Sequence, residues 1–310
     1  MISVVIINFN GVHLLANCIE AAKMHVPSLS EIILLDNGSN DGSVSLVESR
    51  FPTVRLVKSP TNLGFVGGNN EACEIASGKY LLLLNSDTII QNSLQPMIDI
   101  LEKNTSIWVV GCRLKYGNGE LQESIGHQLG PARLALSWTP LVRYFPSLRQ
   151  KESRHSKIYR EALADCEYVS GACLMTPARK WRDLNGLDNN YFMYMEDVDY
   201  CVRVRRLGGR VVYTAESEVT HLEGAGRPWV GRRAVLNTAV SYTIYVRKFH
   251  GVLGRFVLGT VLAPILLLRA FGHRLMHAVG SDPHGKDKSL AYVHASLIVL
   301  IGPRAPNTRY

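Results

Sequence analysis

The chain has 310 residues, of which 46% are hydrophobic and 19% are charged, an ordinary globular composition that allows a large core and one or two domains. Its six cysteines include no Cys-x-x-Cys pair, which argues against a zinc site and against a disulfide framework. The formal net charge is +8, and residues 227–310 hold twelve Lys or Arg against two acids, so this part carries +10 and residues 1–226 carry −2.

Strand and helix patterns alternate through the first part of the chain. Continuous apolar runs predict buried strands, and apolar residues three or four positions apart predict helices. The predicted strands are Ile2–Phe9, Glu31–Leu35, Val54–Val57, Tyr80–Leu84 and Ile107–Leu114. The predicted helices are His13–Lys23, Ser43–Ser49, Val66–Ala76 and Leu94–Lys103. Because each strand–helix–strand unit favours a right-handed parallel crossover, we predict an open α/β sheet.

The middle of the chain is less regular. Residues 117–165 contain a basic stretch interrupted by prolines, residues 131–157, which we interpret as a mobile insertion near the functional site. Further on, the pattern predicts two strands and three helices. These are the strands Tyr168–Thr176 and Arg210–Tyr213 and the helices Ala178–Leu184, Asp197–Leu207 and Arg233–Phe249. Met1 leads directly into an apolar run with no basic segment before it, so we expect no secretory signal.

The last part of the chain combines basic residues with two apolar runs, Phe256–Leu268 and Ser289–Gly302. Basic and apolar residues together favour an anionic membrane surface over nucleic acid as the partner. Both runs are shorter than the roughly 20 residues of a spanning helix, and Pro264 and His294 interrupt them, which favours interfacial or re-entrant helices. A basic helical subdomain packed on the protein is the alternative. We therefore predict two domains, residues 1–226 and residues 227–310.

Polar residues follow the predicted strands at the positions where ligands bind in open α/β sheets, outside the carboxyl ends of the strands. They are Asn8 and Asn10, Asp36, Asn62 and Gly64, Asn85 and Asp87, and His221. A further cluster of three carboxylates, Glu196, Asp197 and Asp199, begins a predicted helix. For any single loop, turn formation and helix capping explain the same residues. The glycines lack the spacing of a dinucleotide fingerprint or a P-loop, so a dehydrogenase and an ATPase are not favoured.

Six short segments, which contain most of these residues, occur in an order and at a spacing that resemble those of a known family. They are Val4–Gly11, Leu35–Ser43, Asn62–Phe65, Leu83–Asp87, Ser170–Ala172 and Met195–Asp199. Together they resemble inverting glycosyltransferases of family 2, especially the rhamnosyltransferase-like branch, over roughly residues 1 to 225. The resemblance implies the GT-A fold, an open and mostly parallel nucleotide-binding sheet flanked by helices.

The resemblance also implies roles for single residues. Asp36 would hold the base or ribose of a nucleotide-sugar donor, and Asn8 and Asn62 would line the nucleotide pocket. Asp87 would be a metal ligand, with His221 as a second, and Asp197 would be the catalytic base, with Glu196 next in rank. The other residues assigned to substrate binding are Asn10, Gly64, Asn85, Gly171 and Arg203. For Arg203 an ion pair with Glu196 and Asp199 is an alternative to a phosphate contact.

The sequence departs from the family pattern at Asn85, where the family often has Asp. A neutral amide lowers the charge of the site, so we expect weak affinity for a free divalent cation and dependence on the nucleotide diphosphate. Because imidazole suits Mn²⁺ better than Mg²⁺, either ion is a candidate cofactor. A lone histidine is also often structural, and this alternative applies to His221.

By this resemblance the protein moves a sugar, with rhamnose, glucose and galactose all open, from a nucleoside-diphosphate sugar to a saccharide or polyprenyl-diphosphate-linked acceptor. Cell-envelope polysaccharide synthesis at the cytoplasmic face of the membrane is the expected setting. A non-catalytic sugar-nucleotide-binding membrane scaffold is an alternative, for which Asn85 is the only indication. A nucleotidyltransferase is less favoured, because Asn8–Gly11 lacks the basic residue of the usual signature loop.

Overall fold

The computed structural model describes residues 1–222 and 231–303, which form two compact units. The described residues of the first unit are 1–127, 151–188 and 196–222, and those of the second are 128–150, 189–195 and 231–303. The predicted domain boundary at residues 226 and 227 lies outside the described residues. Two segments that the sequence analysis placed in the first domain, residues 128–150 and 189–195, belong to the second unit.

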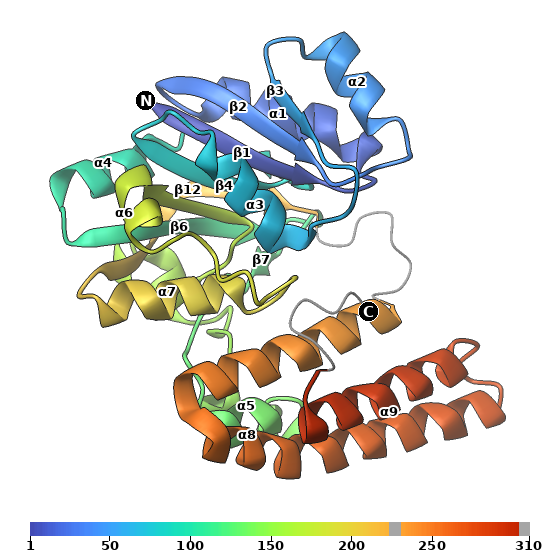
Figure 1. The fold of residues 1–310 in the computed structure, drawn as a ribbon. Coiled ribbons are helices and arrows are strands. Elements are labelled where there is room, and N and C mark those ends of the chain that lie inside the picture. Colours follow the sequence, from blue (N-terminus) through green and yellow to red (C-terminus); the bar gives the residue numbers. More distant parts are fainter. Residues whose placement is uncertain (223–230, 304–310) are drawn as a thin grey trace. The chain divides into compact units, whose positions relative to one another are not determined.

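The described part of the first unit contains a mixed ten-stranded sheet (Figure 1). The main order is β3, β2, β1, β4, β11, β6, β12, β5, with β7 added to β6 and β9 added to β12. The bounds are β1 (Ile2–Asn8), β2 (Leu29–Asp36), β3 (Arg55–Lys58), β4 (Tyr80–Asn85), β5 (Thr88–Ile90), β6 (Ile107–Lys115), β7 (Leu121–Gln122), β9 (Ala164–Asp165), β11 (Cys173–Pro177) and β12 (Arg210–His221). A separate pair joins β8 (Ile125–Gly126) to β10 (Tyr168–Val169). Strands β1 to β4 are parallel, as are β6 and β12, whereas β5, β7, β9 and β11 pair antiparallel.

Helices cover both faces of the parallel strands, which explains the continuous apolar runs Val4–Ile7 in β1, Ile32–Leu35 in β2 and Leu81–Leu84 in β4 (Figure 1). The helices of this unit are α1 (Val12–His25), α2 (Ser43–Arg50), α3 (Gly64–Glu74), α4 (Gln95–Lys103), α6 (Ala178–Asp183) and α7 (Glu196–Arg206), together with the 3-10 helix η3 (Lys157–Arg160). Val4 and Ile6 of β1 belong to the core cluster that contains Leu15 and Ile19 of α1. Ile7 points the other way, toward Gly68 of α3, where an added Cβ would lie 2.9 Å from Ile7 Cγ2.

The predicted open α/β sheet is confirmed, and three local differences have physical reasons. The predicted strand Tyr168–Thr176 is interrupted at residues 170–172, because Gly171 N–H donates to Asp197 instead of to a strand. Strand β12 is longer than predicted and changes register between Thr214 and Glu218. Strand β5 has only three residues, too few for a periodic pattern, and was not predicted.

The second unit is helical in its described residues. It contains α5 (Pro131–Leu136), the short 3-10 helices η1 (Pro140–Arg143) and η2 (Pro146–Leu148), α8 (Arg232–Ala278) and α9 (Gly285–Ile301). Helices α8 and α9 lie side by side (Figure 1). Neither Pro264 nor His294 ends a helix, so the first apolar run belongs to a longer element than its length in sequence suggested. The exposed position of Pro264 leaves the buried face of α8, with Leu262 and Leu266, free to pack.

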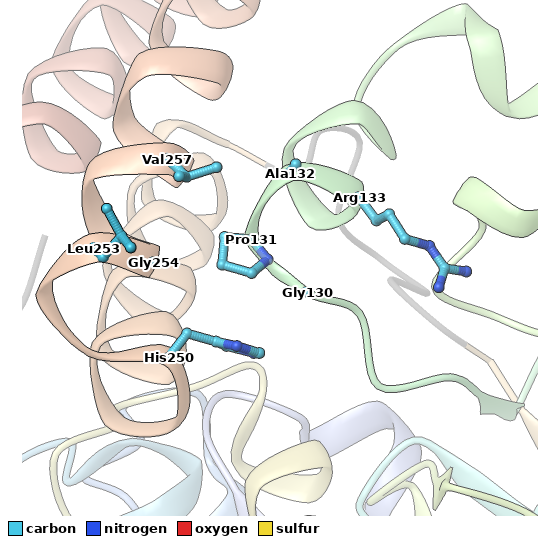
Figure 2. A pocket seen from close by; sticks show the side chains of 8 residues that line it. All are labelled: Gly130, Pro131, Ala132, Arg133, His250, Leu253, Gly254 and Val257. Carbon is cyan, nitrogen blue, oxygen red and sulfur yellow. The ribbon is translucent and has the colours of Figure 1, made fainter.

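Helix α8 changes direction at Gly251, whose φ of 68° and ψ of −163° lie in a region that is essentially restricted to glycine. Beside this break is a largely apolar hollow of about 480 Å³ (Figure 2). It is lined by Gly130, Pro131, Ala132 and Arg133 at the start of α5 and by His250, Leu253, Gly254 and Val257 of α8. Gly254 permits the close approach of α5, because a Cβ there would lie 3.2 Å from Pro131 Cγ.

The backbone conformation at Gly251 predicts how replacing this glycine changes the free energy of unfolding. Gly251→Ala should destabilise the protein by about 1–3 kcal/mol, because alanine cannot adopt this conformation without strain. Gly272→Ala on the same helix is the matched control: Gly272 is helical with open space around it, so alanine should stabilise by up to about 1 kcal/mol. Urea unfolding of the three proteins measures both effects, and equal stability of the two variants would show that the break does not depend on glycine.

Candidate active site

The first group of site residues lies at the carboxyl ends of β1 and β2. Asn8 Nδ2 donates to Asp36 Oδ1 at 2.9 Å and to Ser39 Oγ at 3.1 Å, and Ser39 N–H donates to Asp36 Oδ2 at 2.8 Å. Asn8 and Asp36 are both buried. These bonds therefore fix the positions of both carboxylate oxygens of Asp36. Asn8 Oδ1, next to Asp36, is a buried acceptor that makes no hydrogen bond within the described residues.

The loops around this corner are locked to each other by amides. Asn10 Oδ1 accepts the N–H of Asn40 at 2.9 Å. Buried Asn37 accepts the N–H of Leu63 at 3.2 Å and donates to Gly64 O at 3.0 Å. Sequence reasoning assigned no role to Asn37, although a polar residue directly after the apolar strand end was a usable signal.

Asn62 uses its side chain for a local turn. Its Oδ1 accepts the N–H of Gly64 at 2.8 Å, and Gly64 has a φ of 78°. This is the turn and capping geometry that the sequence analysis kept as the alternative for any single loop. The Nδ2 of Asn62 remains the part of this side chain that could face a nucleotide.

The second group brings Asn85, Asp87 and His221 together. The antiparallel pairing of β5 with β12 places His221 opposite Thr88. As a result His221 Nε2 lies 3.2 Å from Asp87 Oδ1 and 3.3 Å from Asn85 Nδ2, while His221 Nδ1 lies 3.1 Å from Gln122 Oε1. Asn85 Oδ1 is buried with no partner among the described residues.

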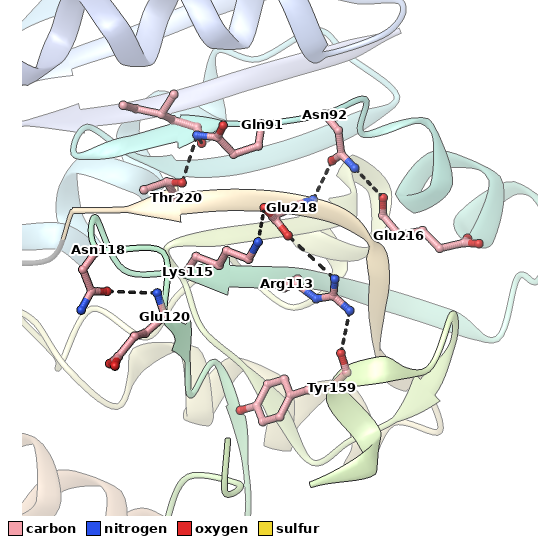
Figure 3. A network of polar contacts seen from close by, with 11 residues as sticks. Gln91, Asn92, Arg113, Lys115, Asn118, Glu120, Tyr159, Glu216, Glu218 and Thr220 are labelled. Atoms are coloured by element: carbon pink, nitrogen blue, oxygen red, sulfur yellow. Dashed lines mark hydrogen bonds and ion pairs between the residues drawn. The ribbon is translucent and has the colours of Figure 1, made fainter. Parts of the chain in front are cut away.

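The end of β12 is fixed by a polar network, shown in Figure 3. Glu218 binds Lys115 of β6 at 2.8 Å and Arg113 at 3.8 Å. Asn92 accepts the N–H of Glu218 at 2.7 Å, and Gln91 Nε2 donates to Thr220 Oγ1 at 3.0 Å. These contacts set the register of the strand three residues before its end, and so fix the face on which His221 lies.

The second group fits a divalent cation that is shared with a substrate. Neighbouring ligands of one octahedral ion lie about 3 Å apart, which matches the 3.2 Å between His221 Nε2 and Asp87 Oδ1. Imidazole and carboxylate are both ligands for Mn²⁺. Residues 1–222 and 231–303 contain no group of three or more His, Cys, Asp or Glu that could hold a metal. An ion here would therefore need further ligands from the substrate, as expected from the neutral side chain of Asn85.

The third group lies at the start of α7. Asp197 Oδ2 accepts the N–H of Gly171 at 3.1 Å, and Oδ1 accepts the N–H of Val198 at 2.8 Å. Burial raises the pKa of Asp197, while these two N–H groups and the charge of Lys151 oppose the rise. Lys151 belongs to the basic stretch of the sequence, but only the fold shows that its charge acts on Asp197. A carboxylate with a raised pKa is a stronger base than an ordinary aspartate.

The two neighbouring carboxyl groups, Glu196 and Asp199, have different surroundings. Glu196 is buried, its Oε2 has no partner among the described residues, and burial followed by the charge of Asp197 raises its pKa well above the usual value. Asp199 is fully buried and accepts from Arg203 Nε at 2.6 Å. Arg203 also donates to two backbone carbonyls, Leu184 O and Gly186 O, each at 2.7 Å. The ion pair with Asp199 is therefore present in the structure.

The three groups lie along one edge of the sheet. Asn85 is opposite Ile7 in the pairing of β4 with β1, one residue before Asn8. Asn85 N–H also donates to Ala172 O at 3.0 Å, next to the Gly171 that binds Asp197. The three groups are far apart in the sequence, but they converge because parallel strands end at the same edge of the sheet.

The raised pKa of Glu196 predicts a pH-dependent stability. In the folded state this carboxyl keeps its proton at pH values where the unfolded chain has lost it, so its contribution to stability is full below about pH 4 and is lost as pH rises. Glu196→Gln should remove this loss and make the protein more stable than the parent at pH 7, with the difference shrinking toward pH 4. Urea unfolding at several pH values measures it, with the exposed Glu71→Gln as control. A parent protein that gains stability relative to the Glu196→Gln variant as pH rises would contradict the buried, protonated state.

Comparison with known proteins adds independent evidence. The family model for glycosyl transferase family 2 matches residues 3–169, more than half of the chain. N-acetylglucosaminyl-diphospho-decaprenol L-rhamnosyltransferase of Mycobacterium tuberculosis H37Rv is 26% identical in an alignment that covers 61% of this chain and 66% of that protein. Rhamnosyltransferase WbbL of Escherichia coli K12 is 24% identical over 51% of this chain and 60% of its own length. The chain thus spans slightly less than two thirds of these relatives.

Solved structures agree on the fold. One is mannosyltransferase PcManGT from Pyrobaculum calidifontis, in complex with GDP-Man and Mn²⁺. It superposes with a TM-score of 0.58 at 14% sequence identity, and the superposition covers 98% of this chain and 88% of the PcManGT chain. GalNAc-T7, with UDP, GalNAc and Mn²⁺, superposes with a TM-score of 0.59 at 19% identity over 80% of this chain and 48% of that one. With this fold, and with the family model matched over more than half its length, the chain belongs to glycosyl transferase family 2.

Proposed function

We propose that this chain is an inverting glycosyltransferase that moves a sugar from a nucleoside-diphosphate sugar to a saccharide or polyprenyl-diphosphate-linked acceptor in cell-envelope polysaccharide synthesis. The observation that supports it best is that Asp197, a carboxylate with a raised pKa, and the pair formed by Asp87 and His221 lie along the same sheet edge. The names of the relatives in M. tuberculosis and E. coli K12 make rhamnose the first donor sugar to test. Glucose is a second candidate donor sugar, because a glucosyltransferase of E. coli is 25% identical over 39% of this chain. Galactose is the third candidate.

The proposed base is Asp197. An acceptor hydroxyl attacks the anomeric carbon from the face opposite the leaving diphosphate, and it must lose its proton as the new bond forms. The N–H groups of Gly171 and Val198 orient the two carboxylate oxygens. Burial makes Asp197 a stronger base, and the pairing of Asp199 with Arg203 removes one competing negative charge nearby. Glu196 is the next residue in rank for this role.

The leaving diphosphate gains negative charge as the bond to the sugar breaks. A divalent cation, Mg²⁺ or Mn²⁺, neutralises such charge as a Lewis acid when it is bound. Asp87 and His221 are the residues we propose to hold it, and Asn85 offers an additional neutral donor. Arg203 is less suited to a phosphate contact, because its three nitrogens already bind Asp199 and two carbonyls.

We assign the nucleotide to the corner formed by β1, β2 and the start of α3. Asp36, oriented by Asn8 and Ser39, is the residue we propose to accept hydrogen bonds from a base or ribose. The pre-set positions of these groups mean that little ordering is needed on binding. Asn10, Asn62 and Gly64 belong to the loops that border the corner, and Gly171 borders the acceptor side through its contact with Asp197.

The second unit supports a membrane-associated acceptor. Six exposed apolar residues and Thr260, each three or four positions from the next, form a stripe along α8, here called the apolar stripe: Leu253, Phe256, Thr260, Pro264, Leu267, Phe271 and Leu275. The opposite face of the helix is buried in the unit. Exposed apolar surface of this extent is unusual for a protein surrounded by water. By length and composition α8 could also cross a membrane, the one such helix among the described residues, although a third of its most apolar segment is buried.

Charge favours a lipid surface as the partner of the apolar stripe. Arg255, Arg269 and Arg274 lie on the same helix, and no acidic residue occurs between Glu223 and Asp282. Basic residues near an anionic leaflet contribute about 1 kcal/mol each. We propose peripheral association with the cytoplasmic face, where a soluble nucleotide-sugar donor can meet a lipid-linked acceptor.

The assignment of the base predicts the effect of Asp197→Asn. The variant keeps the shape of the side chain but cannot take a proton, so transfer should fall by about 10²–10⁴-fold while donor binding persists. Release of nucleoside diphosphate from a panel of deoxythymidine- and uridine-diphosphate sugars, with and without a polyprenyl-diphosphate-linked acceptor, measures transfer and identifies the donor.

The control for this experiment is Asp183→Asn, which neutralises an exposed carboxylate of the same unit. Near-normal turnover of the Asp197→Asn variant would move the base to Glu196. Donor binding by the parent protein without any release would instead support the non-catalytic scaffold.

The apolar stripe predicts binding of the full chain to vesicles that contain anionic lipid, with only partial release by high salt. Phe256→Glu together with Phe271→Glu should weaken this binding at least about tenfold, because each change removes an exposed ring and adds a repelled charge. Leu207→Glu is the matched control, since Leu207 directly follows α7 and is 62% exposed. Sedimentation with vesicles measures all three, and a parent chain that stays in solution would refute the membrane proposal.

A further inference from the structure

Gln122 contacts the side of His221 that faces away from Asp87. It lies on β7, which pairs with β6 through Leu114, and its side chain is buried. Gln122 Oε1 is 3.1 Å from His221 Nδ1. His221 is 8% exposed, so its ring is enclosed and its hydrogen bonds are set by these neighbours. Nothing in the sequence pattern identified Gln122, because strand β7 has only two residues.

This contact decides which nitrogen of the neutral ring carries the proton. An amide oxygen can only accept a hydrogen bond, so Nδ1 must be the donor, and a neutral imidazole has a single N–H. The lone pair is then on Nε2. That nitrogen lies 3.3 Å from Asn85 Nδ2, which can donate to it, and 3.2 Å from Asp87 Oδ1, which cannot.

In the other tautomer the same geometry would produce a different site. A proton on Nε2 would be donated to Asp87 Oδ1, and this hydrogen bond would occupy both groups that the proposed function assigns to a metal. With the proton on Nδ1, two acceptors face each other at 3.2 Å, an arrangement that a cation between them stabilises.

We propose that Gln122 is a positioning residue that keeps His221 in the Nδ1–H tautomer and so leaves His221 Nε2 and Asp87 Oδ1 available to one divalent cation. This inference rests on the proposed function, since it assigns Gln122 a task only if the pair binds a metal. It adds a residue that orients a ligand without touching the metal or the substrate.

The first test is Mn²⁺ binding by the full chain, measured from the loss of the free Mn²⁺ signal in electron paramagnetic resonance, with uridine diphosphate present. Gln122→Met keeps the length of the side chain but removes the amide acceptor, and should weaken binding about 10–100-fold. Gln122→Glu retains an acceptor at the same place and should bind Mn²⁺ within a few fold of the parent. Gln95→Met is the control, because Gln95 is exposed on α4 and its amide bonds to Asp99 of the same helix, not to the ring.

The second test reads the tautomer directly and requires no activity. Nitrogen-15 NMR of histidine-labelled protein distinguishes a protonated from an unprotonated ring nitrogen, and His221→Gln assigns the signal among the ten histidines. In the metal-free parent, the neutral form of the ring should show a protonated Nδ1 and an unprotonated Nε2. Gln122→Met should shift the proton toward Nε2, and Gln122→Glu should not.

The outcomes separate this inference from the proposed function. A parent chain that binds no Mn²⁺ with or without nucleotide would refute the metal assignment of the proposed function. A parent that binds Mn²⁺ but shows a protonated Nε2, or a folded Gln122→Met variant with unchanged affinity, would overturn the role of Gln122 alone. Circular dichroism establishes that the variant is folded, and the NMR result on the parent does not depend on any variant.

Discussion

The candidate active site depends on the antiparallel pairing of β5 with β12. Asp87 directly precedes β5, and His221 ends β12, so the pairing of Thr88 with His221 is what brings the two side chains together. The N–H of Leu222 donates to Asp87 O at 2.8 Å and closes the same pair from the other side. A shift of one residue would turn His221 to the opposite face of the sheet. The ion pairs of Glu218 with β6 therefore serve the site, since they hold the strand in register.

Three carboxyl groups crowd the first turn of α7, and the fold gives each a different state. Asp199 pairs with Arg203, which also donates to two backbone carbonyls. Glu196 is enclosed without a partner for Oε2 among the described residues, and burial favours its neutral form. Asp197 alone of the three combines a raised pKa with two N–H donors that support its ionised form. Neighbouring groups whose pKa values differ because of their surroundings are typical of acid and base assignments in enzymes.

The sequence predicts what depends on local pattern and misses what depends on pairing. The strands around β1 were predictable because they are buried on both faces, and the convergence of Asn8, Asp36 and Asn85 followed from the geometry of parallel strands. Strand β5 and Gln122 were missed because segments of two or three residues carry no periodicity. The continuation of α8 past Pro264 is a tertiary effect, in which packing of the buried face outweighs the loss of one backbone hydrogen bond.

The neutral amide of Asn85 couples the proposed metal to the donor. With Asp87 as the one carboxylate beside His221 among the described residues, the site has less negative charge than a pair of aspartates would give, so an ion would rely on diphosphate oxygens. Linkage is reciprocal: if the diphosphate raises the affinity for the ion, the ion raises the affinity for the diphosphate by the same factor. Once the sugar is transferred, loss of either one weakens the hold on the other. A site built in this way favours arrival and departure of the ion together with the nucleotide, which suits the transfer we propose, because each turnover would release one nucleoside diphosphate.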